Sequence, residues 1–117
     1  MLRRLEKAVA KYVPGADKKL LSQVTRQYIS EELDITLAFL QLRDVLLNIG
    51  TILEEDKDNN IYVAVIESGV MNANPCIVVT QLFENKAVMF GFAREGLIKQ
   101  QTARKAINKL KKELEKG

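Results

Sequence analysis

The chain has 117 residues, 47% of them hydrophobic and 28% charged, which excludes a disordered or collagen-like chain. Its length permits one domain with its own hydrophobic core and is short for two, so we expect a single domain over residues 1–117. Its apolar runs fall far short of the roughly 20 residues that span a membrane, so no membrane association is expected.

The net charge of +3 is distributed unevenly along the chain. Residues 1–28 carry seven Lys/Arg and two Asp/Glu, residues 29–68 carry two and nine, and residues 69–117 carry nine and four. This pattern indicates either charge pairing within the fold or an exposed basic surface.

Helices are predicted for most of the chain before residue 50. Apolar residues spaced at three and four predict a helix over Leu2 to Tyr12, which Pro14 ends. Asp17 is suited to cap the N-terminus of a second helix, and Ser30 is suited to cap the N-terminus of a third helix. Gly50 is expected to end the third helix.

The third predicted helix, about residues 31–49, is apolar around most of its circumference, with only a narrow polar wedge. One apolar side consists of Ile35, Ala38, Phe39, Leu42, Val45, Leu46 and Ile49, and another of Leu33, Leu37, Leu40 and Leu47. A helix on the surface of a monomer needs one apolar stripe. The pattern therefore favours either a central helix or a subunit interface.

Short β-rich runs with turn residues between them follow this helix. The predicted strands are Thr51 to Glu55, Ile61 to Glu67, Cys76 to Phe83 and Ala87 to Ala93. Their short connections predict an antiparallel meander. Several strands are apolar at consecutive positions, so both faces of the sheet are expected to be covered, in part by a second copy of the chain.

The last predicted helix, about Thr102 to Glu115, has the sharpest apolar stripe, formed by Ala103, Ala106, Ile107, Leu110 and Leu114. Opposite the stripe lies a lysine row, formed by Lys105, Lys109, Lys112 and Lys116. The row is either a solvated face or a contact for an acidic protein or a nucleic acid. Because no aromatic residue lies among these lysines, base stacking is not favoured.

The absence of histidine excludes Ser-His-Asp and Cys-His catalysis and the histidine-based zinc motifs. No glycine-rich phosphate loop occurs either. We therefore expect no enzymatic activity and no cofactor. The single cysteine, Cys76, cannot form an internal disulfide, and this fits a cytoplasmic location and a buried structural role.

Residues 56–67 partly match a calcium-binding loop. The oxygen-bearing residues Asp56, Asp58, Asn60 and Glu67 stand at loop positions 1, 3, 5 and 12. Position 6, which needs glycine for a sharp turn, holds Ile61, and the residues after it have the pattern of a strand. A hairpin turn is therefore expected here, and no metal site.

Taken together, these patterns predict an α+β fold with a helical N-terminal half, a four-stranded antiparallel meander and a C-terminal amphipathic helix packed on the sheet. The expected function is a non-catalytic protein-interaction or adaptor domain that self-associates, with the lysine row as a contact for an acidic protein partner. The alternative is a nucleic-acid-binding protein that uses the same helix non-specifically.

Overall fold

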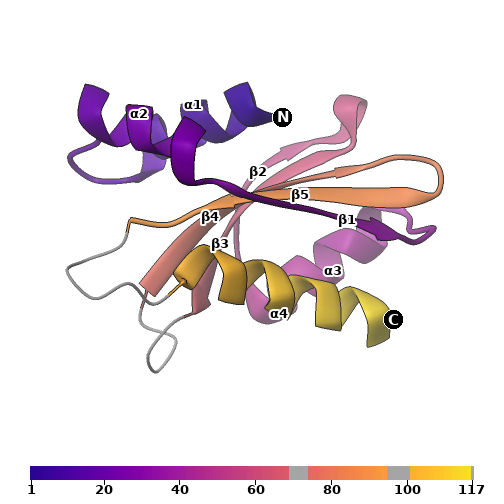
Figure 1. Ribbon diagram of the computed structural model, residues 1–117. Coiled ribbons are helices and arrows are strands. Elements are labelled where there is room, and N and C mark those ends of the chain that lie inside the picture. The colour runs from indigo at the N-terminus through magenta and orange to yellow at the C-terminus, as the bar shows by residue number, and fades with distance from the viewer. Residues whose placement is uncertain (69–73, 95–100, 117) are drawn as a thin grey trace.

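The chain folds as an α+β structure with helices on both faces of an antiparallel sheet (Figure 1). The computed structural model describes residues 1–68, 74–94 and 101–116. Its elements are α1 (Leu2–Tyr12), α2 (Lys18–Gln27), β1 (Ile29–Asp34), α3 (Phe39–Ile49), β2 (Gly50–Asp56), the 3-10 turn η1 (Lys57–Asn59), β3 (Ile61–Ser68), β4 (Asn74–Leu82), β5 (Lys86–Phe92) and α4 (Thr102–Lys116). The strand order is β1-β5-β4-β3-β2, and each neighbouring pair is antiparallel.

The two N-terminal helices form where the apolar spacing predicts them. Asp17 caps α2, and its carboxylate accepts a hydrogen bond from the Leu20 backbone N–H at 2.9 Å. The inner sides of both helices contribute to a core on one face of the sheet, together with side chains of β3, β4 and β5. Its buried members are Leu5, Ala8, Val9, Leu20, Val24, Ile61, Val63, Ile77, Val79 and Phe92.

The start of the third predicted helix is wrong. Residues Ile29–Asp34 form the edge strand β1, so the sheet has five strands instead of four and the N-terminal half is not wholly helical. Ser30 lies in this strand opposite Phe90 and does not cap a helix. Half-buried and exposed side chains alternate along β1, and its backbone pairs with β5 along its whole length. This long-range pairing outweighs the local helical spacing.

The remaining helix α3 is fixed at its N-terminal end by contacts with β3. Its first turn is capped by Gln41, whose side-chain oxygen accepts from the Ala38 N–H at 2.8 Å. The rings of Phe39 and Tyr62 stack with centroids 4.2 Å apart, and the Tyr62 hydroxyl donates to the Phe39 carbonyl at 2.7 Å. Burial raises the pKa of Tyr62 to about 12. Gly50 ends the helix, as predicted.

The predicted C-terminal helix is confirmed, and it packs on the face of the sheet opposite α1 and α2 (Figure 1). The whole apolar stripe is buried, and the helix contacts α3 and the strands β1, β3, β4 and β5. Cys76 is fully buried in the same core. Because the chain's own helices contact both faces, the sheet does not require a second copy to cover it.

Candidate interaction surfaces

The lysine row lies on the side of α4 that faces away from the core. Lys105, Lys112 and Lys116 are exposed, and Lys109 is half-buried. Two of the four ammonium groups have partners: Lys109 donates to the Glu67 carbonyl oxygen at 3.3 Å, and Lys116 pairs with Glu113 at 3.1 Å. Within the described residues, Lys105 and Lys112 therefore remain as the unpaired charges of the row.

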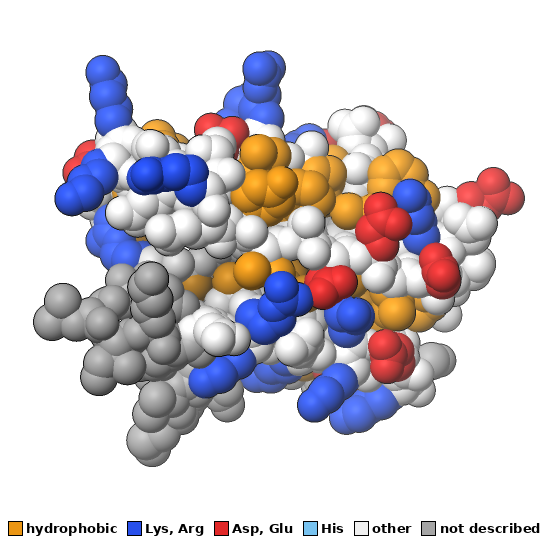
Figure 2. Space-filling view, in the orientation of Figure 1, with side chains coloured by type: hydrophobic (Ala, Val, Ile, Leu, Met, Phe, Trp, Pro, Cys, Tyr) orange, Lys and Arg blue, Asp and Glu red, His pale blue; other side chains and the backbone are white. Residues whose placement is uncertain are grey.

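The two cations beside the row are used within the fold. Arg104 donates to the carboxylate of Glu31 at 2.8 Å, and Lys111 lies 3.8 Å from the same group. These contacts join α4 to the edge strand β1. In Figure 2, Lys and Arg side chains project both from the upper layer that contains α1 and α2 and from the lower layer that contains α4.

A second basic surface lies along α1, outside the site residues predicted from the sequence. A hollow of about 700 Å³ is lined by this helix and by residues of β2, β3 and β4, and its basic lining residues are Arg3, Arg4, Lys7 and Lys11. Arg4, Lys7 and Lys11 are spaced at three and four residues and share one side of the helix, and Arg3 lies four residues before Lys7. That spacing is the signal by which the sequence could have identified the surface.

The acidic stretch 54–56 neutralises half of this basic surface. Glu54 accepts from the Tyr12 hydroxyl at 2.6 Å and lies 3.5 Å from the ammonium of Lys11. Asp56 accepts from the Arg4 guanidinium at 2.7 Å. Of the four basic residues that line the hollow, Arg3 and Lys7 have no ion pair within the described part of the chain. In the described residues, five ion pairs join the basic ends of the chain to residues 29–68, so internal pairing accounts for part of the charge asymmetry of the sequence.

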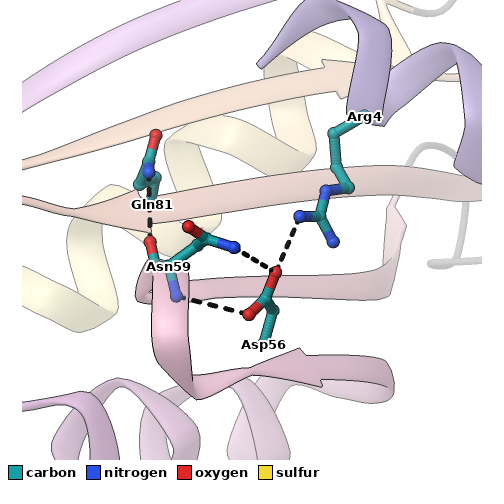
Figure 3. A network of polar contacts seen from close by, with 4 residues as sticks. All are labelled: Arg4, Asp56, Asn59 and Gln81. Carbon is teal, nitrogen blue, oxygen red and sulfur yellow. Dashed lines mark hydrogen bonds and ion pairs between the residues drawn. The ribbon is translucent and has the colours of Figure 1, made fainter.

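The network around Asp56 ties η1 to α1 and to β4 (Figure 3). Its carboxylate accepts from the backbone and side-chain nitrogens of Asn59 at 3.3 and 2.9 Å, and Gln81 donates to the Asn59 carbonyl at 3.1 Å. The hydrogen bonds from the Asn59 side chain and from Arg4 hold the pKa of Asp56 below its usual value.

We predict that Asp56→Asn destabilises the protein at pH 7 and that this loss disappears in acid. A carboxylate with a lowered pKa in the folded state stabilises it above the unfolded pKa of about 3.9, and this contribution is lost as pH falls through the folded pKa. Urea unfolding at pH 7 and pH 3 measures the difference. Asp58→Asn, an exposed neighbour, is the control. An equal loss at both pH values would contradict the electrostatic role of Asp56.

The partial calcium motif is not assembled into a loop. Asp56 begins a 3-10 turn that ends at Asn60, and β3 starts with the next residue. Glu67 lies near the far end of β3, opposite Pro75, roughly 20 Å along the strand from Ile61. Over residues 1–68, 74–94 and 101–116, no cluster of three or more His, Cys, Asp or Glu is placed to hold a metal ion.

Among the described residues, the most exposed of the large apolar side chains lie on α3. Leu40 is 68% exposed and Leu47 is 50% exposed, whereas Leu42 and Leu46 on the opposite side of the helix are fully buried. The third large apolar side chain, Phe83, is 45% exposed and lies under the ammonium of Lys86 at 5.4 Å. The sequence indicates the two leucines through the unusually wide apolar surface of this segment.

Comparison with protein-family models, with curated proteins and with solved structures finds no match to this chain. In the described part of the chain, no helix is both long and apolar enough to cross a membrane. Functional inference therefore depends on the surfaces described above.

Proposed function

We propose that this protein is a non-catalytic interaction domain that self-associates through α3. The supporting observation is the exposure of two leucines seven residues apart on one side of a short helix. Single exposed apolar residues are common on protein surfaces, but neighbouring ones mark contact sites more often. Burial of a leucine side chain contributes roughly 1.5–3 kcal/mol, so covering both leucines favours association.

The non-catalytic part of the proposal is supported by the residue types of the chain. It has no histidine, and its single cysteine is fully buried. The side chains of Lys105 and Lys112 extend from α4 into solvent, where an acidic protein partner can pair with them. A cytoplasmic location fits the lone cysteine and is part of the same proposal.

We expect the wild-type protein to sediment as a mixture of monomer and dimer at micromolar concentration. The double variant Leu40→Lys/Leu47→Lys is expected to sediment as a monomer, because it places two cations in the contact. A matched control, Ala10→Lys/Gln27→Lys, adds the same charge at exposed positions of α1 and α2 and is expected to leave the association unchanged. A wild-type protein that remains monomeric at 100 μM or so would contradict the proposal.

The alternative, non-specific nucleic-acid binding through the lysine row, is favoured by the two unpaired lysines in the described part of α4. Phosphate contacts make such binding strongly salt-dependent. Retention on immobilised duplex DNA that falls steeply between roughly 50 and 200 mM salt would support this alternative. Weak retention with little salt dependence would leave the acidic protein partner as the favoured occupant of the row.

A further inference from the structure

Four residues of α3 form a pattern that can complement itself. An α-helix turns about 100° per residue, so Leu40 and Leu47 lie within about 20° of one line along the helix. Arg43 and Asp44 lie about 50° to either side of that line, midway between the leucines along the axis. The surface thus has two apolar residues along its middle and one charge of each sign at its flanks.

The charges distinguish between the two ways in which this surface can pair about a two-fold axis. In a parallel pair, each flank of the helix faces the opposite flank of the other copy, so Arg43 faces Asp44 of the partner subunit at two equivalent places. In an antiparallel pair centred between these residues, each flank faces its own counterpart. Arg43 would then face Arg43 of the partner subunit, and Asp44 would face Asp44 of the partner subunit, with repulsion at both places.

We infer that α3 forms a parallel two-fold dimer interface whose partner is a second copy of this chain. Leu40 packs against Leu40 of the partner subunit, Leu47 against Leu47 of the partner subunit, and Arg43 pairs with Asp44 of the partner subunit. This inference rests on the proposed self-association and adds which residues meet. It also explains why the two flanking charges have opposite sign.

Both charged side chains are placed to make this contact. Asp44 is exposed and has no hydrogen bond or ion pair within the described residues. The side chain of Arg43 is 41% exposed, and its Nε donates to Glu55 of the edge strand β2 at 3.0 Å. That bond uses one of the five N–H donors of the guanidinium and holds Arg43 on the β2 side of α3.

The size of the helix sets the expected affinity. The 11 residues of α3 extend about 16 Å, which is short for an interface that must bury roughly 800 Å² on each copy. We therefore expect a dimer with a dissociation constant in the micromolar range, which sedimentation can measure directly.

Charge reversal tests the arrangement. Arg43→Glu and Asp44→Lys each place like charges opposite one another twice in a parallel pair, so each is expected to weaken the dimer about tenfold or more. The double variant Arg43→Glu/Asp44→Lys exchanges the two charges and is expected to restore the dimer to within about threefold of the wild type. Lys19→Glu, which reverses an exposed charge on α2, on the other face of the sheet from α3, is the control and is expected to change the dissociation constant less than about twofold.

Cross-linking gives a second measurement that does not depend on charge. In the parallel pair, the two copies of residue 47 lie in contact, so the thiols introduced by Leu47→Cys are expected to form an intersubunit disulfide under mild oxidation. Cys76 is fully buried and does not compete. In an antiparallel pair, residue 47 instead lies opposite residue 40, and a disulfide between Leu40→Cys and Leu47→Cys chains would form in its place.

The outcomes separate the inference from the function on which it rests. A wild-type protein that stays monomeric contradicts the proposed self-association itself. A wild-type dimer that keeps its affinity after either single charge reversal, or that cross-links between positions 40 and 47, overturns the parallel arrangement and leaves the self-association standing. The parallel arrangement is supported if both single variants lose affinity, the double variant recovers it, and the chains with cysteine at position 47 form a disulfide.

Discussion

Leu110→Ala is expected to lower the free energy of unfolding by about 2–5 kcal/mol. Leu110 is fully buried in the core that α4 shares with α3 and the sheet. Truncating the side chain removes apolar contacts and leaves a cavity, since the closely packed side chains of the core around α4 relax only partly. Urea unfolding followed by circular dichroism at neutral pH gives the difference.

Lys112→Ala is the matched control for this prediction. Lys112 lies on the same helix two residues further on, and its side chain is exposed. Its replacement is expected to change the free energy of unfolding by less than about 0.5 kcal/mol. If Leu110→Ala costs as little as the control, α4 is not held by its apolar stripe and the core on this face is described wrongly.

Local patterns in the sequence were sufficient for α1, α2, α4 and four of the strands. The apolar period of the three helices fits only a helix, and the four strands are short β-rich runs that turn residues separate clearly. Residues 29–37 satisfy two periods at once. Apolar side chains stand an even number of residues apart, as on one face of a strand, at Ile29, Leu33, Ile35 and Leu37. From Ile35 onward, the apolar spacing also fits a helix. Pairing with β5, far along the chain, decides between them, and a local pattern does not contain that information.

The candidate surfaces were predictable to different degrees. The position of the lysine row follows from the apolar stripe of α4, because a helix that buries one side exposes the other. Its function remains a proposal. The long-range ion pairs could not be predicted, because they join residues 52 positions apart in Arg4–Asp56 and 73 apart in Arg104–Glu31. Such pairs depend on how the helices lie on the sheet, which the sequence does not state directly.

Gly50 joins α3 to β2 at a place where two strands approach closely. It ends the helix and begins β2, where it lies opposite Ile66 of β3. Its backbone is extended, with φ of −167°, so any residue can adopt the conformation. Space is the constraint, because a Cβ at this position would overlap the backbone carbonyl oxygen of Val65 and lie 3.3 Å from a side-chain carbon of Ile66.

Gly50→Ala is therefore expected to destabilise the protein by about 3 kcal/mol, at the upper end of the usual cost of overpacking, because a backbone atom in a paired strand cannot move aside as a side chain can. Gly91→Ala provides the comparison. There the added Cβ would meet only side-chain atoms, Ile107 carbons at 3.2 Å and the Cys76 sulfur at 3.3 Å, so we expect a cost of about 1 kcal/mol. Urea unfolding of both variants gives the order. If Gly91→Ala proves the more damaging, β2 shifts away from β3 more readily than the side chains around Gly91 move aside, and lack of space at Gly50 is not the larger constraint.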